Sequence, residues 1–286
     1  MNKNIRENAE LRGSFFALAE RVFGLSFAGW YAEGYWREKY IPYALTYGND
    51  VVANASVNII DMEWRHKPRR YIQIGTVMTA PEYRKRGFCR RLLETILKDW
   101  RKESDAIYLF ANDGVLDFYP KFGFERAVQY QYTVELRHRR RIGETRKLDM
   151  SAAADVAILE EYYKKSNPYS AFTERDNFGL LMFYCSSFMK DCVYLSEDLG
   201  VVAVMGRESE NLICYDIYGD GARPLLEALE TFAGIEAKNV LLGFTPTDFI
   251  SMEGVEVGGG DTLFMLKGKE NLFCRNRISF PLLSHA

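Results

Sequence analysis

Hydrophobic and polar positions follow two different periods along the first half of the chain. Apolar residues spaced three and four apart predict helices over residues 8–23 and 87–98, because that spacing places them on one helix face. Shorter apolar runs bounded by turn residues predict strands. The expected strands are 43–46, 51–60, 71–79, 107–111 and 129–136, with one more short helix at 114–119. Helices interleaved with strands predict an α/β (α+β) fold with a mixed sheet.

The second half of the chain repeats this outline. Three landmarks recur: Val-Val-Ala at 51–53 and 201–203, Leu-Leu-Glu at 92–94 and 225–227, and a short buried strand at 107–111 and 240–244. The helix and the strand after it have the same separation in both halves, which predicts a duplicated fold. We therefore expect two related mixed-sheet domains flanked by helices, residues 1–148 and residues 149–286.

The two halves differ in the connection between the third strand and the helix that follows it. The first half uses 13 positions, from 79 to 92, whereas the second uses 7, from 218 to 225. The shorter connection runs through Gly219-Asp220-Gly221, where the Asp220 carboxylate would repel an anion at the helix start. The second domain is therefore expected to be a degenerate copy without an anion-binding loop.

Composition narrows the class of protein. The 286 residues are 48% hydrophobic and 27% charged, which is typical of a soluble globular protein. No run approaches the roughly 20 apolar residues of a membrane helix, and the charged start lacks the apolar segment of a secretion signal. Five cysteines without a Cys-x-x-Cys pair, and only three histidines, predict reduced thiols and no metal site. We expect a cytoplasmic protein with no membrane partner.

Charge is distributed unevenly along the chain. Residues 1–150 carry a formal charge of +7 and the remainder −9. The first half therefore favours an anionic ligand and the second could attract a cationic one, although uneven surface decoration accounts for the same numbers. The basic cluster at 138–141 is short and lacks interleaved aromatic residues, so no nucleic-acid partner is expected.

A candidate anion site lies at the start of the helix at 87–98. Residues 80–93 read Ala-Pro-Glu-Tyr-Arg-Lys-Arg-Gly-Phe-Cys-Arg-Arg-Leu-Leu. A turn that enters a helix presents backbone N–H groups with no partner in the helix, and the helix dipole adds positive potential there. Gly87 lets the backbone approach a phosphate closely. From the charge pattern alone, the alternative is a cationic helix start on a solvated surface.

The full string resembles motif A of the GNAT (GCN5-related N-acetyltransferase) superfamily. That motif is an Arg/Gln-x-x-Gly-x-Gly/Ala loop that binds the pyrophosphate of acetyl-CoA. Arg84, Gly87 and Cys89 occupy its positions here. Cys89 departs from the usual Gly or Ala, but it is still a small residue.

Residues 112–125 resemble motif B of the same superfamily, in which an Asn lies seven residues before a Tyr and Gly-Phe closes the turn. Asn112, Tyr119 and Gly123-Phe124 match this pattern. The resemblance implies acetyl-CoA (CoA) as the cofactor, with Asn112 near its pantetheine arm and Tyr119 near its sulfur. It also implies that the arm bonds the backbone of Val77, Met78 and Thr79 in a splay between parallel strands. The N–H groups implied to hold the pyrophosphate are those of Lys85, Arg86, Gly87, Phe88, Cys89 and Arg90.

The tandem arrangement resembles the enhanced-intracellular-survival (Eis) acetyltransferases, without the sterol-carrier-like domain of those proteins. This resemblance implies that the second domain shapes the acceptor site and that the carboxylate of the last residue, Ala286, acts as general base. A frayed terminus is the alternative for this segment. Asp61 and Glu63, at the end of a strand, are further candidates that would act through a water molecule.

Acyl transfer from a thioester to an amine needs a neutral amine, a donor to the developing oxyanion and a proton for the departing thiolate. The N–H of Met78 or Thr79 could be the donor. A phenol with a pKa near ~10 is protonated at neutral pH, so Tyr119 is expected to be the general acid. A tyrosine whose ring only packs is the alternative.

The expected function is therefore that of an N-acetyltransferase acting on a small-molecule or lysine amine by direct attack. Aminoacyl transfer, a non-catalytic acyl-CoA-binding regulator and an interaction module stay open. The charge asymmetry favours a cationic primary amine, such as a polyamine, an aminoglycoside-like molecule or a lysine side chain. The aromatic segment from Trp30 to Tyr43 could form a cation–π wall or pack as ordinary core. The sequence does not predict the oligomeric state.

Overall fold

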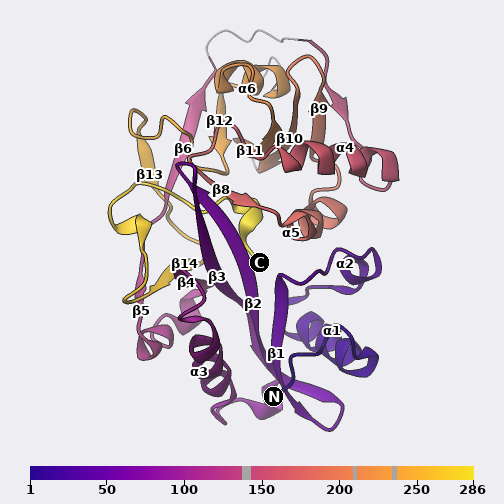
Figure 1. Cartoon of the computed structure of the whole chain (residues 1–286), viewed down its shortest axis with the longest axis vertical. Coiled ribbons are helices and arrows are strands. Elements are labelled where there is room, and N and C mark those ends of the chain that lie inside the picture. The colour runs from indigo at the N-terminus through magenta and orange to yellow at the C-terminus, as the bar shows by residue number, and fades with distance from the viewer. Residues whose placement is uncertain (137–142, 209–210, 234–236) are drawn as a thin grey trace.

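The computed structural model describes residues 1–136, 143–208, 211–233 and 237–286, and it contains two mixed sheets (Figure 1). The basic cluster at 138–141 lies outside the described residues. The first sheet has the strand order β1 (Tyr40–Tyr47), β2 (Asp50–Trp64), β3 (Lys67–Thr79), β4 (Ala106–Ala111), β14 (Thr262–Leu266), β5 (Phe124–Arg126), and β8 (Phe172–Arg175) pairs with β2. The second has the order β13 (Gly254–Glu256), β6 (Tyr130–Glu135), β12 (Asn239–Leu242), β11 (Asn211–Gly219), β10 (Val201–Glu208), β9 (Val193–Ser196), β7 (Arg146–Lys147).

Six α-helices surround these sheets in the part of the chain that the structure describes. They are α1 (Ala9–Phe23), α2 (Ala28–Ala32), α3 (Phe88–Trp100), α4 (Ala153–Lys164), α5 (Phe178–Phe183) and α6 (Leu225–Ala233). The expected helix at 8–23 is confirmed: the Asn8 side chain accepts a hydrogen bond from the Leu11 N–H at its start, and Gly24 ends it at a φ of 67°. A π-helical turn, Tyr184–Phe188, continues α5.

The expected helix at 114–119 is wrong. Two short 3-10 turns, Asp113–Val115 and Tyr119–Phe122, stand in its place. Pro120 explains the break, because its ring disfavours helical backbone at the preceding residue and it has no N–H to donate.

The two sheets share one strand plan, which confirms the two related mixed sheets. β2 pairs antiparallel with both β1 and β3, and β4 pairs parallel with β3. β9, β10, β11 and β12 repeat these directions in the second sheet. In each sheet, the pairing with the strand before the helix contains a register shift. It lies between Asn54 and Ser56 of β2, opposite β3, and between Val204 and Met205 of β10, opposite β11.

Each sheet includes a strand from the other half of the chain. β6 forms near the expected position but lies in the second sheet, between β12 and β13. β14 lies in the first sheet, between β4 and β5. A division at residue 148 therefore separates both strands from their own sheets. An alternating apolar pattern identifies a strand but not the partner with which it pairs.

A buried core joins the two sheets. Tyr71 and Tyr108 of the first sheet share it with Tyr132 of the second and with Phe280 from the C-terminal segment. The rings of Tyr108 and Phe280 stack at a centroid distance of 4.0 Å. The C-terminus consequently lies in the middle of the molecule, close to both sheets (Figure 1). Within the described ranges, we find no helix of the length and apolar character needed to span a membrane.

Candidate active site

β3 and β4 separate where the first sheet reaches the helix α3. Their parallel pairing runs from Tyr71↔Ala106 to Gln73↔Tyr108 and ends there, although both strands continue. The strand ends beyond this point line a cleft with a volume of ≈ 590 Å³. Unpaired backbone groups on two facing strand ends can bond an extended ligand placed between them.

A β-bulge shapes the β3 side of this cleft. Ser56 pairs with Gly75 and Asn54 pairs with Met78, so Thr76 and Val77 have no counterpart on β2. Thr76 adopts a φ of 48°, a sparsely populated conformation for a β-branched residue. The strain is held by buried hydrogen bonds: the Asn54 amide donates to the Thr76 carbonyl at 3.0 Å, and the Tyr40 and Thr76 hydroxyls lie 2.9 Å apart.

The connection from β3 to α3 has the properties of an anion site. Its residues are exposed, and Gly87 precedes the helix at a φ of 77° without a side-chain cap. The first helical hydrogen bond runs from the Arg91 N–H to the Gly87 carbonyl at 3.1 Å. None of the N–H groups from Lys85 to Arg90 has a hydrogen-bond partner among the described residues. Such a run of free donors at a helix N-terminus fits a phosphate group.

Cys89 lies in the first turn of α3, with its sulfur 3.1 Å from the Thr79 hydroxyl oxygen. The thiol therefore faces the end of β3 and leaves the backbone of the loop open. Arg84 and Arg86 bond carbonyls of the same connection, those of Thr79 and Glu82. The basic side chains thus hold the loop and add positive potential around it.

Asn112 and Tyr119 follow β4 on the opposite wall of the cleft. The Asn112 side-chain oxygen accepts a hydrogen bond from the Gly114 N–H at 3.2 Å, which fixes the turn and leaves the amide nitrogen for a ligand. The Tyr119 ring is 5% exposed and packs against Phe124 and Phe264. Its hydroxyl has no hydrogen-bond partner within the described ranges.

Burial, together with smaller contributions from the nearby Cys89 and Asp261, raises the pKa of Tyr119 to about 12. The phenol therefore stays protonated at every pH at which an amine acetylation assay is run.

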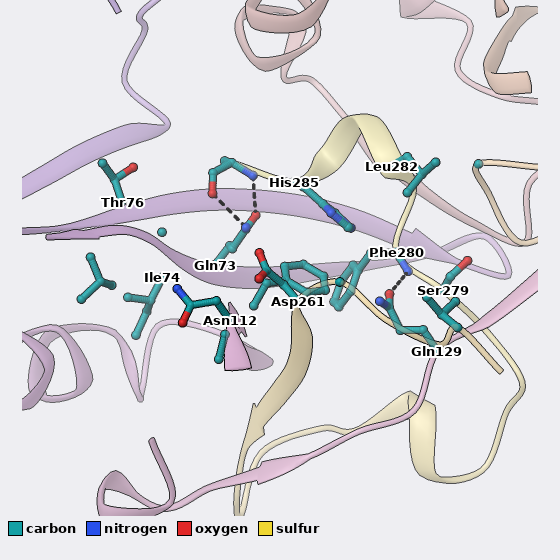
Figure 2. Close-up of a pocket in the computed structure, with 18 of the residues that line it drawn as sticks. Gln73, Ile74, Thr76, Asn112, Gln129, Asp261, Ser279, Phe280, Leu282 and His285 are labelled. Atoms are coloured by element: carbon teal, nitrogen blue, oxygen red, sulfur yellow. Dashed lines mark hydrogen bonds between the residues drawn. The ribbon is translucent and has the colours of Figure 1, made fainter. Parts of the chain in front are cut away.

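Ala286 lines the same cleft as Tyr119. Gln73 holds it with both ends of its amide: the side-chain nitrogen donates to the Ala286 oxygen at 2.9 Å, and the Ala286 N–H donates to the side-chain oxygen at 3.0 Å (Figure 2). Gly75 allows the approach, because a Cβ there would lie 2.4 Å from the Ala286 carbonyl oxygen. The expected alternative of a frayed terminus is therefore not what the structure shows.

Four of the residues expected at the site line this one cleft: Val77, Asn112, Tyr119 and Ala286. The loop from Lys85 to Arg90 lies outside it, at the N-terminus of α3. Met78 and Thr79 pair with β2 rather than line the cleft. Of these three residues, the bulge residue Val77 is the one that lines the cleft.

Asp61 and Glu63, the other candidates for the general base, do not line the cleft. Asp61 accepts hydrogen bonds from Arg70 and lies 3.0 Å from Lys39, and Glu63 pairs with Arg175. Burial alone would raise the pKa of Asp61, but hydrogen bonds from these two cations outweigh it and the pKa is lowered. A carboxylate held in this way, outside the cleft, is a poor general base.

The aromatic segment is core rather than a wall for an acceptor. Trp30, Trp36, Tyr40 and Tyr43 are each at most 8% exposed, and the Trp30 indole donates to the Gly179 carbonyl at 2.6 Å. The ordinary packing alternative is therefore the correct one for these residues.

Sequence reasoning missed several residues of the cleft. Asp261, which follows three glycines between β13 and β14, and His285 both line it (Figure 2). The His285 ring packs against Phe110 at a centroid distance of 4.1 Å. The hydrogen bonds by which Gln73 holds Ala286 have no signal in the sequence. The Gly-Gly-Gly-Asp run was the one signal available, because such a run marks a loop that approaches a ligand or another chain segment.

At the corresponding strands of the second sheet, the described residues make different contacts. Asp220, in the short connection to α6, accepts a hydrogen bond from Lys165 at 2.9 Å. The C-terminal segment lies next to β12, where the Leu282 N–H donates to the Gly243 carbonyl at 2.8 Å. Leu283 is buried in the core of this sheet. The chain itself thus occupies the position that the first sheet leaves open.

Known proteins share both the sequence signature and the fold. The family of the acetyltransferase (GNAT) domain matches residues 8–127. A GCN5-related N-acetyltransferase from Kribbella flavida is 19% identical with a TM-score of 0.54, covering 90% of this chain and 70% of that one. Eis1 from Mycobacterium abscessus is 14% identical with a TM-score of 0.58, covering 90% and 71%. A conserved Enterococcus faecalis protein of unknown function is 13% identical with a TM-score of 0.60, covering 93% and 70%.

Among curated proteins, no sequence matches this chain. The identities to the solved structures are low, so those likenesses concern the fold, whereas the family match covers the bulge, the loop and the turn that carry the site. Residues 8–127 thus match the acetyltransferase (GNAT) domain family, and a solved GCN5-related N-acetyltransferase shares the fold over most of the chain.

Proposed function

We propose that this protein is an acetyl-CoA-dependent N-acetyltransferase that acetylates a primary amine by direct attack. The observation that carries the proposal is the meeting of Val77, Tyr119 and the Ala286 carboxylate in one cleft, which adjoins a loop of free backbone donors. Neither half of the chain contains this set by itself, since Ala286 comes from the far end of the sequence.

The first domain, proposed as residues 1–148, would hold the cofactor. The free N–H groups from Lys85 to Arg90 fit the pyrophosphate, and the separated ends of β3 and β4 fit the pantetheine arm. Bound acetyl-CoA would supply the acetyl group as a thioester. The N–H of Val77, in the bulge, would then donate to the acetyl oxygen as its negative charge develops.

Tyr119 is proposed as the general acid. Its hydroxyl is protonated and unpartnered within the described residues, and its ring is fixed by packing. A pKa of about 12 makes it a weaker acid than free tyrosine. The same burial also raises the proton affinity of a departing thiolate, so donor and acceptor shift in the same direction.

The Ala286 carboxylate is proposed as the general base. Gln73 and Gly75 fix its position, and a carboxylate held in the cleft can take the proton that an attacking amine loses. The second domain, proposed as residues 149–286, contributes by shaping the acceptor side through Phe183, Phe188 and Leu242.

The test is a thermal-shift titration with acetyl-CoA, followed by a transfer assay on a panel of amines. A ligand at 100 times its Kd should add about 2.7 kcal/mol to the free energy of unfolding. Absence of any stabilisation would overturn the proposal. Stabilisation without transfer to any amine would instead favour a non-catalytic acyl-CoA-binding regulator.

Gly75→Ala should lower kcat roughly 10- to 100-fold, because the added methyl group must displace the Ala286 carboxylate. The Kd for acetyl-CoA should stay within about threefold of the wild-type value, since the change lies away from the loop at Lys85–Arg90. The measurement is steady-state kinetics together with calorimetry.

The matched control is Gly13→Ala, in α1, where a new Cβ meets no atom within 4 Å. This variant should retain full activity. If Gly75→Ala also retained full kcat while folding normally, the Ala286 carboxylate would not be the base.

A further inference from the structure

We infer that the acceptor is a small primary amine with one positive charge on an apolar alkyl or aryl body, and not a polyamine. The inference rests on the proposed acetyl transfer and adds the chemical class of the acceptor. It follows from the side chains that line the cleft outside the reacting groups.

The rim of the cleft is apolar and exposed. Phe23, Val115, Phe188 and Val257 are between 36% and 62% exposed, and all four line it. They are four of the nine large apolar side chains that are exposed in the described part of the chain. They come from four separate segments, so no single amphipathic element accounts for their meeting. Exposed apolar side chains gathered at one cleft mark a binding site for an apolar group.

The part of the rim formed by Phe183 and Phe188 is fixed by packing against other aromatic side chains. Phe183, at the end of α5, packs its ring against Phe27 at 5.5 Å and Trp30 at 5.6 Å. Phe188 packs against Phe183 at 5.6 Å and closes the π-helical turn. The buried aromatic segment therefore acts indirectly: it supports the two phenylalanines that face the cleft.

Charge within the cleft is sparse and negative. Asp261 is the one ionised side chain among the described residues that line it, and the Ala286 carboxylate is the second negative group. No Lys or Arg side chain lines the described cleft. The His285 ring is neutral, since burial lowers its pKa to about 4. Two carboxylates attract one ammonium group, which must lose its proton to react.

A polyamine would fit this arrangement poorly. Its second and third ammonium groups would lie among Phe23, Phe188 and Val257, where no carboxylate of the described lining can pair with them. Placing an unpaired ammonium group against apolar surface is unfavourable. The −9 charge of the second half is therefore not the feature that selects the acceptor. The lining of the cleft favours an amine with one positive charge over a polyamine.

The experiment is an acetyl-transfer assay with saturating acetyl-CoA on linear alkylamines from propylamine to octylamine, phenethylamine and spermidine. We expect kcat/KM to rise about three- to fourfold for each methylene that the rim covers. Phenethylamine should exceed spermidine at least tenfold, and its kcat/KM should change less than twofold between low and high salt.

Phe188→Ala should lower kcat/KM for octylamine about tenfold while changing that for propylamine less than twofold. Ile250→Ala is the matched control, because Ile250 is 77% exposed and lies outside the cleft. It should leave the whole series unchanged.

A flat alkylamine series, a preference for spermidine, or no transfer to any amine while acetyl-CoA still stabilises the protein would each overturn this inference. Of these three results, only the absence of transfer to any amine would also count against the proposed acetyl transfer. Failure of acetyl-CoA itself to stabilise the protein would overturn the proposed function, and the acceptor class with it.

Discussion

Gly87→Asp should weaken the binding of acetyl-CoA about 100-fold, which corresponds to about 2.7 kcal/mol. Gly87 is the residue before α3, at a φ of 77°, and it lies among the free N–H groups from Lys85 to Arg90. A carboxylate there would face the pyrophosphate with like charge and would compete for the same backbone donors. Isothermal titration calorimetry measures the change directly.

The control for backbone strain is Gly24→Asp. Gly24 ends α1 at a φ of 67°, and a Cβ there meets no atom within 4 Å, as at Gly87. Both variants therefore place the same side chain in left-handed backbone, but only one lies at the proposed phosphate site. Equal affinity of the two variants for acetyl-CoA would show that the loop does not bind the pyrophosphate.

Tyr119→Phe should lower kcat by roughly 100-fold or more, the usual contribution of a positioned general acid. The Kd for acetyl-CoA should change little, because the ring contacts with Phe124 and Phe264 remain. The hydroxyl has no hydrogen-bond partner in the described part of the chain, so its loss should cost little stability. Single-turnover kinetics with saturating acetyl-CoA separates the chemical step from binding.

Tyr169→Phe is the control, since Tyr169 is 8% exposed, outside the cleft, and loses a hydrogen bond to the Arg223 carbonyl. It should lose about 1 kcal/mol of stability and keep its activity. A kcat for Tyr119→Phe within threefold of wild type would remove Tyr119 from the mechanism.

The pH dependence of activity is a second test of the role of Tyr119. Because its pKa in the folded protein is raised to about 12, above the value of ~10 for an unfolded chain, the group contributes stability below pH ~10 that is lost as the pH rises toward 12. Activity should therefore increase with pH as the amine deprotonates, with no loss from Tyr119 below pH ~10. A fall in kcat between pH 8 and 9 that Tyr119→Phe abolishes would contradict the raised pKa.

Local sequence determined the parts of the site that depend on neighbouring residues. The run from Arg84 to Cys89 specifies an exposed turn with a positive-φ glycine and a helix start, and the structure shows both. Asn112 and Tyr119 similarly mark the turn after β4, although Pro120 broke the helix that was expected between them. These features arise within about ten residues, where backbone preference and side-chain spacing suffice.

Only the tertiary structure decided the features that join distant parts of the chain. Gln73 and Ala286 are separated by 213 positions, yet their hydrogen bonds hold Ala286 in the cleft that Tyr119 also lines. The exchange of β6 and β14 between the sheets, and the presence of Phe23 and Phe188 in one cleft, are of the same kind. A periodic pattern shows that a residue is buried or exposed, but which surfaces meet depends on the packing of the whole chain, because many pairings bury similar apolar area.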